Sequence, residues 1–136
     1  MVERVLVVDD SSLMRVVIKD LMAADDAFEV VGEAVDGHEA LSQARELKPD
    51  LILLDIEMPR MNGIEALKRL SLLSTAPVVI VSSAAQVGSD QALEALRLGA
   101  AAVVAKPSGA LSLDLEAKRG HEIVRAARQA VGLDGA

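Results

Sequence analysis

Residues 51–67 read LILLDIEMPRMNGIEAL, which predicts, in order, a strand, a loop and the start of a helix. The apolar run at residues 51–54 shows no alternation, which is typical of a strand buried on both faces. Asn62 and Gly63 have the chemistry of a turn and a helix cap. Apolar residues then recur from Ile64 with helical spacing. The segment therefore predicts one strand–helix unit of an α/β protein.

The same unit recurs along the chain. Comparable apolar runs alternate with segments of helical periodicity, at residues 5–8, 28–32, 78–81 and 102–105. Connections this short favour helical crossovers between parallel strands, with helices on both faces of the sheet. We therefore predict a three-layer α/β/α fold of the (βα)5 type. The last helix should begin near Ala117, after an ordered loop at residues 108–116.

The length of the chain, 136 residues, fits one domain with one core. We expect residues 1–131 to form that domain and residues 132–136 to begin a linker or to end the expressed segment. The longest uncharged stretch, residues 70–89, contains Pro77, Gly88 and several serines. It is therefore expected to form a helix end, a turn and a strand, and no membrane insertion is expected.

The composition excludes several classes of function. Asp and Glu number 21 against 14 Lys and Arg, the net charge is −7, and Phe28 is the only aromatic residue. An acidic chain without stacking side chains is poorly suited to bind nucleic acid directly. The absence of Cys excludes disulfides, thiolate metal sites and thiol nucleophiles. Together with the absence of a signal peptide, it indicates a cytoplasmic location.

Polar or charged side chains that suit catalysis follow four of the five predicted strands. They are Asp9 and Asp10, Asp55, Ser82 and Ser83, and Lys106, which precedes Pro107. In an open parallel sheet, ligands bind beyond the carboxyl ends of the strands. Three carboxylates, a hydroxyl and an ammonium group are thus expected at one edge of the sheet.

Three adjacent carboxylates repel one another, and a raised pKa or a bound cation relieves the repulsion. Oxygen ligands without nearby His or Cys favour a hard ion, and few carboxylates completed by water suit Mg²⁺ better than Ca²⁺. A metal beside an attacking carboxylate, with Lys106 and Ser82 to hold oxygens, is suited to phosphoryl transfer onto aspartate. Asp55 is the predicted nucleophile. Taken alone, Asp9 and Asp10 could instead cap the following helix.

Five motifs occur in a fixed order: VVDDSSLMR at 7–15, LLDIEMPRMNG at 53–63, VSS at 81–83, GA at 99–100 and KP at 106–107. This pattern resembles the receiver domain of bacterial two-component response regulators. The resemblance covers nearly the whole chain and implies a flavodoxin-like sheet of strand order 2-1-3-4-5.

The resemblance also implies roles for individual residues. Asp55 would accept a phosphoryl group from a histidine kinase. Mg²⁺ would be held by Asp10, Asp55 and the backbone carbonyl of Glu57, with Asp9 acting through a coordinated water. Ser82 and Lys106 would bind phosphoryl oxygens. The bond between Lys106 and Pro107 would be cis, as cis bonds are largely confined to X-Pro.

A finer resemblance concerns residues 106–115, KPSGALSLDL, which precede a basic last helix. Together with the VSS motif, they are similar to the receiver of the chemotaxis protein-glutamate methylesterase. In that family the receiver regulates a catalytic domain that acts on chemoreceptors. That domain is absent here, since the chain has no Gly-x-Ser-x-Gly elbow, and any methylesterase activity would belong to a parent protein.

Two positions depart from the receiver pattern. Val103 stands where receivers usually carry an aromatic residue whose rotamer tracks phosphorylation. Glu57 adds a carboxylate two residues after the nucleophile.

The sequence allows two other functions beside a receiver that controls a methylesterase. One is a standalone receiver that acts by binding a partner. The other is a haloacid-dehalogenase-like phosphohydrolase, which needs an Asp two residues after its nucleophile, where this chain has Glu57. His38 and His121 are expected to be ordinary polar residues, and the basic face of the last helix is expected to be solvated.

Overall fold

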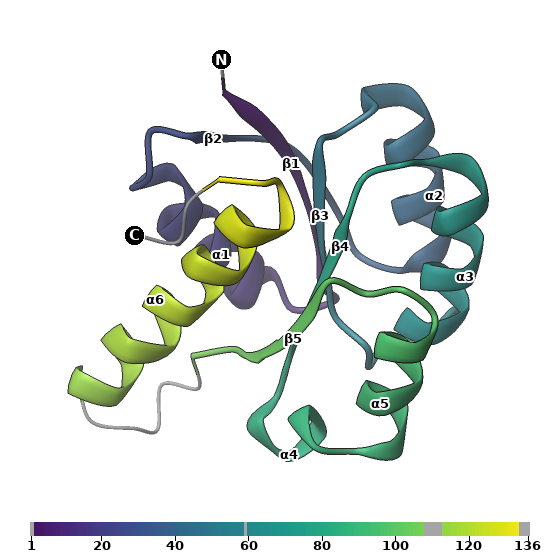
Figure 1. The fold of residues 1–136 in the computed structure, drawn as a ribbon. Helices are drawn as coiled ribbons and strands as arrows, with labels where there is room; N and C mark the ends of the chain where they lie inside the picture. The colour runs from purple at the N-terminus through teal and green to yellow at the C-terminus, as the bar shows by residue number, and fades with distance from the viewer. Residues whose placement is uncertain (1, 59, 108–112, 134–136) are drawn as a thin grey trace.

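The computed structural model describes residues 2–58, 60–107 and 113–133. Strands and helices alternate along the chain (Figure 1). They are β1 (Glu3–Val8), α1 (Ser12–Ala23), β2 (Phe28–Ala34), α2 (Gly37–Leu47), β3 (Leu51–Leu54), α3 (Gly63–Leu73), β4 (Val78–Ser82), α4 (Ala84–Val87), α5 (Asp90–Arg97), β5 (Ala102–Ala105) and α6 (Leu113–Ala130). All strand pairs are parallel, and their order is β2-β1-β3-β4-β5. The predicted fold class and strand order are confirmed.

The sheet separates two apolar cores, because successive side chains of a strand point to opposite faces. In β1, Val5 and Val7 belong to the core that Ile18 of α1 and Ile123 of α6 complete. Leu6 and its alternate neighbours face the other core, which α2, α3 and α5 cover. The strands buried on both faces read as continuous apolar runs, as the sequence predicted.

Short polar residues start the helices. The side chain of Ser11 accepts a hydrogen bond from the backbone of Met14 and caps α1, while Asp36 caps α2 and Asn62 caps α3. The cap interpretation of Asn62 is therefore confirmed. Because Ser11 is the cap of α1, the alternative in which the aspartate pair serves this purpose is wrong.

The segment after β5 differs from the prediction. Helix α6 begins at Leu113, four residues before the expected start, so the helix replaces the end of the predicted loop. Residues 113–117 include Leu, Glu and Ala, which are good helix formers. The rest of that loop, residues 108–112, and the chain end, residues 134–136, lie outside the described residues.

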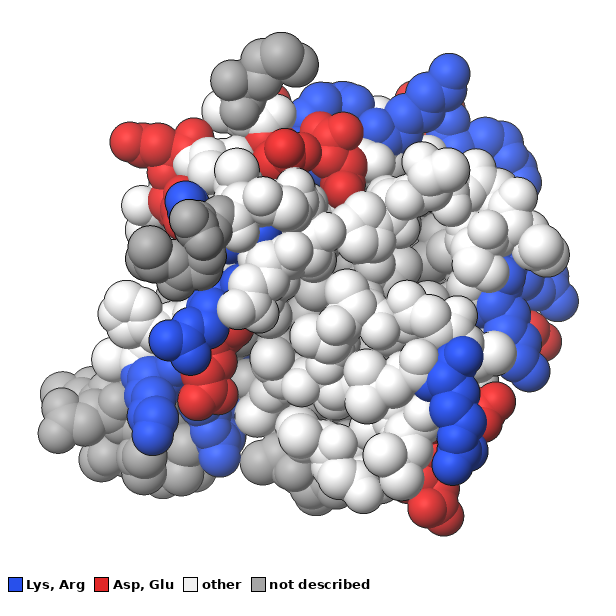
Figure 2. Space-filling model, in the orientation of Figure 1, with Lys and Arg blue, Asp and Glu red and all other residues white. Residues whose placement is uncertain are grey.

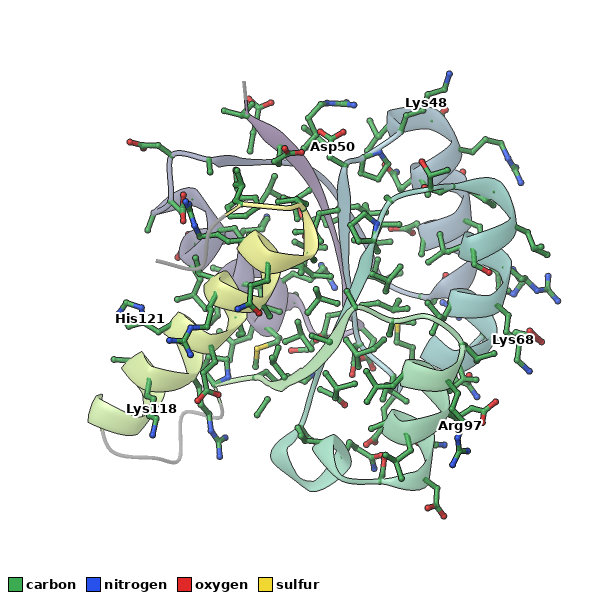
Figure 3. All side chains as sticks on the ribbon, viewed as in Figure 1. Lys48, Asp50, Lys68, Arg97, Lys118 and His121 are labelled. Carbon is green, nitrogen blue, oxygen red and sulfur yellow. The ribbon has the colours of Figure 1, made fainter. Side chains whose placement is uncertain are left out.

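The face of the molecule in Figure 2 carries few charges at its centre, and charged side chains of both signs lie along its margins. Lys118 and His121 project from the outer side of α6, while Lys48 and Asp50 lie at the end of the sheet where β3 begins (Figure 3). Among the described residues, no helix combines the length and the apolar character needed to cross a bilayer.

Candidate functional site

Four neighbouring strands bring the predicted site residues together at their carboxyl ends. Parallel pairing continues just beyond the strands: the Asp55 amide donates to the carbonyl of Val8 at 3.0 Å, and the Lys106 amide donates to that of Ser82 at 2.9 Å. Strand β3 lies between β1 and β4, and Asp9 directly follows β1. Residues from opposite ends of the sequence thus meet because of the strand order.

The three predicted carboxylates form a cluster. Oxygen atoms of Asp9, Asp10 and Asp55 all lie within 4.8 Å of one another, and among the described residues this is the one group with the composition and spacing of a metal site. Asp9 and Asp55 are buried, with 0% and 3% of their surface exposed. Asp10 is exposed, so the cluster opens to solvent on its side.

Lys106 partly neutralises this cluster. Its Nζ lies 2.8 Å from Oδ2 of Asp9 and 3.5 Å from Oδ2 of Asp55. Burial by itself favours the neutral amine, but the hydrogen bond to Asp9 and the charges of both carboxylates outweigh it, so the pKa of Lys106 is raised. Lys106 thus pairs with two of the three carboxylates, which leaves room for further positive charge.

The environment of Asp55 disfavours its charged form relative to that of an exposed carboxyl when no cation is bound. Burial raises the pKa of its carboxyl from 3.8 to about 6, and the charge of Asp9 adds to this increase. Lys106 and a hydrogen bond from the Glu57 amide oppose it. A divalent cation beside the group would favour the charged form that a nucleophile needs.

This pKa predicts a stability difference for Asp55→Asn in metal-free protein. The folded state binds the proton of Asp55 more tightly than the unfolded chain does, so ionisation lowers the stability of the wild type as the pH rises from about 4 through about 6. Asn does not ionise. The variant should therefore gain stability over the wild type across this window, reaching roughly 2–3 kcal/mol at about pH 8.

Urea unfolding followed by circular dichroism measures this difference, since the chain has no Trp or Tyr for fluorescence. Saturating Mg²⁺ should reduce the gain, because a bound cation favours the ionised wild-type carboxylate. A difference that stays constant between about pH 4 and pH 8 would contradict the raised pKa.

Ser82 presents a hydroxyl that is ready for a ligand. The residue is 1% exposed, and its Oγ is buried without a hydrogen-bond partner in the described structure. A buried hydroxyl without a partner costs stability and calls for an explanation. Its position at the end of β4, beside the strand that leads to Asp55, suits donation to an oxygen of a ligand on that carboxylate.

The loop after Asp55 passes very close to the start of α3. The amide of Gly63 donates to the carbonyl of Ile56 at 2.7 Å. A Cβ on Gly63 would lie 2.4 Å from the carbonyl oxygen of Asp55 and 2.5 Å from Cα of Ile56. Glu57 is exposed, and its amide donates to Oδ1 of Asp55 at 3.3 Å. Gly63 therefore permits the backbone path on which the Asp55 loop depends.

The structure corrects one prediction at the end of β5. The peptide bond between Lys106 and Pro107 is trans, as are the other described peptide bonds. An X-Pro bond favours trans by about 0.5–1 kcal/mol unless its surroundings oppose it, and Pro107 is buried here in the trans form. Val103 is partly buried against the core under α2, α3 and α5.

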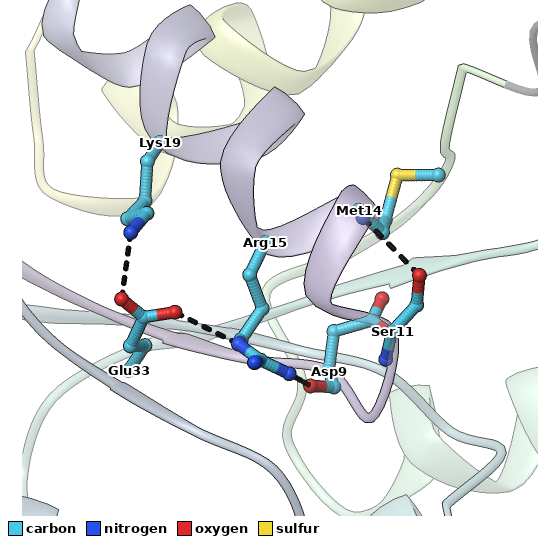
Figure 4. A network of polar contacts seen from close by, with 6 residues as sticks. All are labelled: Asp9, Ser11, Met14, Arg15, Lys19 and Glu33. Atoms are coloured by element: carbon cyan, nitrogen blue, oxygen red, sulfur yellow. Dashed lines mark hydrogen bonds and ion pairs between the residues drawn. The ribbon is translucent and has the colours of Figure 1, made fainter.

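Sequence reasoning missed a network beside the acidic cluster (Figure 4). Arg15 donates to the carbonyl oxygen of Asp9 and to the carboxylate of Glu33, which Lys19 also contacts. Their hydrogen bonds, that of Lys19 first, hold the pKa of Glu33 below its usual value. Glu33 lies near the end of β2, the one strand for which the sequence predicts no site residue. The spacing of Arg15 and Lys19, one helical turn apart, was the available signal.

A second missed contact joins the loops before α2 and α3. Asp36 accepts hydrogen bonds from the backbone of Glu39 and from the guanidinium of Arg60, and both hold its pKa below the usual value. Arg60 has a left-handed backbone, with φ 64°. Asp36 thus caps α2 and also anchors the loop that follows Asp55.

This arrangement has the features of a receiver: a doubly wound sheet of order 2-1-3-4-5, an aspartate cluster at the ends of β1 and β3, and a lysine after β5. The sequence profile described as the response regulator receiver domain matches residues 5–118. The chain belongs to this family and is a receiver of two-component signalling.

Its relatives carry a more particular name. The protein-glutamate methylesterase/protein-glutamine glutaminase 1 of Syntrophomonas wolfei is 50% identical over 113 residues, which are 83% of this chain and 32% of that protein. The corresponding protein of Thermotoga maritima is 47% identical over 131 residues, which are 96% of this chain and 38% of that protein. The chain thus spans about a third of the length of the curated relatives it matches.

Two solved structures similar to this chain also come from chemotaxis proteins. The response regulator domain of Thermotoga maritima CheB is 46% identical with a TM-score of 0.87, and the match covers 98% of this chain and 99% of that one. A chain from the complex of the CheA3 P1 domain with CheY6 of R. sphaeroides is 42% identical, with a TM-score of 0.77 and coverage of 94% and 95%. The present chain is homologous to the receiver domain of CheB.

Proposed function

We propose that Asp55 is the phosphoryl acceptor and that the donor is the phosphohistidine of a histidine kinase. An oxygen of the Asp55 carboxylate attacks phosphorus, an O–P bond forms, the N–P bond breaks, and the electron pair returns to the imidazole nitrogen. The observation that carries this proposal is the meeting of a buried carboxylate, the Lys106 ammonium and the unpaired Ser82 hydroxyl at one sheet edge.

The chain's own residues would hold the product. An aspartyl phosphate adds about −1.5 to −2 charges, and the ammonium of Lys106 already lies within 3.5 Å of an Asp55 oxygen. We assign Lys106 to one phosphoryl oxygen and the hydroxyl of Ser82 to another. Each group would gain a partner on phosphorylation, and Lys106 would move away from Asp9. This movement would carry the signal to β4 and β5.

The donor set fits Mg²⁺. We assign the ion to the carboxylates of Asp10 and Asp55 and the backbone carbonyl of Glu57, with Asp9 acting through a water. All are oxygen ligands, and the exposed side of the cluster leaves access for water. When bound, Mg²⁺ supplies charge that offsets the carboxylates and the phosphoryl oxygens.

Metal dependence is the test of this proposal. Acetyl phosphate, a small phosphoryl donor, should add one phosphoryl group to the wild type with Mg²⁺, and none after chelation by EDTA. Asp10→Asn should slow the reaction, because it removes one ligand and one charge, and Asp20→Asn on the exposed face of α1 should not. Intact-mass measurement over time follows the product. Equal incorporation with and without Mg²⁺ would refute the metal assignment.

We propose further that residues 1–131 are the regulatory part of a cytoplasmic chemotaxis protein whose methylesterase domain acts on chemoreceptors. The names of the relatives and the short share of their length that this chain covers support this reading. The CheA3 P1 domain in one similar structure supports a kinase of the CheA type as donor. Because Val103 has no ring to change rotamer, the signal would pass through the loops after β4 and β5.

A receiver that works alone is the second candidate. It would bind its partner through the surface beside β5, where Leu93 and Leu96 of α5 are 47% and 45% exposed. The reading frame downstream of Ala136 distinguishes the two, since a methylesterase would contain a serine in a Gly-rich strand-to-helix turn. The chain belongs to the receiver family, and this excludes the haloacid-dehalogenase-like phosphohydrolase.

A further inference from the structure

Arg15 contacts two separate parts of the molecule at once. Its Nη1 donates to the backbone carbonyl oxygen of Asp9 at 2.7 Å, and its Nε donates to Oε1 of Glu33 at 2.8 Å (Figure 4). The Arg15 side chain is 14% exposed, so it is largely removed from water although it belongs to the first turns of α1. The guanidinium thus lies between β2 and the loop that carries the acidic pair.

A bulge in β2 makes this contact possible. Val5 pairs with Val30, but Leu6 pairs with Gly32, so β2 contains one extra residue. Val30 packs in the core under α1, whereas Gly32 lies against Leu47 of α2. The bulge therefore changes which residues face each side, and it turns the next side chain, that of Glu33, toward α1.

Lys19 provides an internal comparison. It lies one turn after Arg15 on α1, and its Nζ binds the other oxygen of Glu33 at 2.6 Å. Glu33 is 40% exposed, and ion pairs of such exposure contribute only about 0–1 kcal/mol. The ion pairs by themselves thus contribute little to the fold. What Arg15 has and Lys19 lacks is the hydrogen bond to Asp9.

The side chain and the backbone of Asp9 are held by different partners. The amide of Ser11 donates to Oδ1 at 2.9 Å, and Nζ of Lys106 approaches Oδ2 at 2.8 Å. Arg15 binds the backbone carbonyl that links Asp9 to Asp10. The carboxylate of Asp10 is exposed, so its direction depends on the backbone that carries it.

We infer that Arg15 is a positioning residue for the phosphorylation site: anchored by Glu33, it fixes the backbone between β1 and α1 so that Asp10 is directed toward Asp55. This inference rests on the proposed function, in which Asp10 and Asp55 bind Mg²⁺. Residues beyond the metal ligands that fix their orientation typically change metal affinity by about 10- to 100-fold when removed.

The direction of the change in Mg²⁺ affinity distinguishes a positioning role of Arg15 from an effect of its charge. Arg15 carries a positive charge near a cation site, so its charge alone opposes Mg²⁺, and its removal would strengthen binding. Loss of the Asp9 contact frees the loop and weakens binding. A weaker affinity after removal of Arg15 can therefore not come from the loss of its charge.

Calorimetric titration with Mg²⁺ alone tests the inference on the wild type, Arg15→Met, Lys19→Met and Glu33→Gln. Arg15→Met should bind Mg²⁺ about 10-fold more weakly. Lys19→Met loses the same charge and the same Glu33 partner but keeps the Asp9 contact, so its affinity should equal or exceed that of the wild type. Glu33→Gln should weaken binding by less than Arg15→Met, because Arg15 loses its anchor but remains present.

Each contrary result has a defined meaning. Wild-type affinity in Arg15→Met, or equal weakening in Lys19→Met, would overturn the positioning role and leave the proposed function intact. No Mg²⁺ binding by the wild type would overturn both. Arg15→Lys keeps the charge without the guanidinium fork and should also bind more weakly. Circular dichroism shows whether each variant folds. If Arg15→Met does not fold, the Mg²⁺ affinity of Arg15→Lys tests the positioning role instead.

Discussion

Asp55→Asn should reduce phosphoryl incorporation from acetyl phosphate and Mg²⁺ to background. The amide that replaces the carboxylate has nearly the same shape but no nucleophilic oxygen anion, so the O–P bond cannot form. The surrounding contacts should persist, since the Glu57 amide still finds an acceptor oxygen at this position. Intact-mass measurement reads the loss directly.

Asp20→Asn is the matched control for this variant, because it removes one carboxylate from an exposed position on α1. It should be phosphorylated like the wild type. Phosphoryl incorporation that persists in Asp55→Asn would mean that another side chain is the acceptor. Asp9 and Asp10 would then be the first to be examined, since they share the cluster.

Gly63→Ala should lower the free energy of unfolding by about 3 kcal/mol, toward the upper end of the usual cost of overpacking. The added methyl group would meet the carbonyl oxygen of Asp55 at 2.4 Å and Cα of Ile56 at 2.5 Å. Both are backbone atoms, so the loop itself must move. The displacement should also slow phosphorylation, because it shifts the residue that accepts the phosphoryl group.

Gly88→Ala provides the comparison for this variant. A Cβ on Gly88 meets no atom within 4 Å, and its φ of −100° suits any residue. Its stability should stay within about 0.5 kcal/mol of the wild type. Urea unfolding of both variants measures the difference. Equal stability of the two would contradict the close approach of α3 to the Asp55 loop.

The sequence predicted the fold and the cluster for a simple physical reason. Buried parallel strands read as apolar runs, and the residue that follows each run must lie at the same sheet edge as its neighbours. The sequence alone therefore predicts that Asp9, Asp55 and Lys106 lie together. Their ion pairs and the buried position of Ser82 agree with that expectation.

Other features depend on information that is not local. The bulge that turns Glu33 toward Arg15 follows from the pairing of two strands, and the contact of Arg60 with Asp36 joins loops 24 residues apart. Helix α6 begins early because residues near Leu113 favour a helix, although the Gly and Ser residues before them suggested a longer loop. The trans bond before Pro107 corrects an expectation carried by resemblance alone.

The most direct test of the central claim is the position of the phosphoryl group in the wild-type chain. Borohydride reduces an aspartyl phosphate to homoserine, and tandem mass spectrometry of the resulting peptides locates the changed residue. After treatment with acetyl phosphate and Mg²⁺, we expect homoserine at position 55 and at no other aspartate. Homoserine at position 9 or 10, with Asp55 unchanged, would contradict the account.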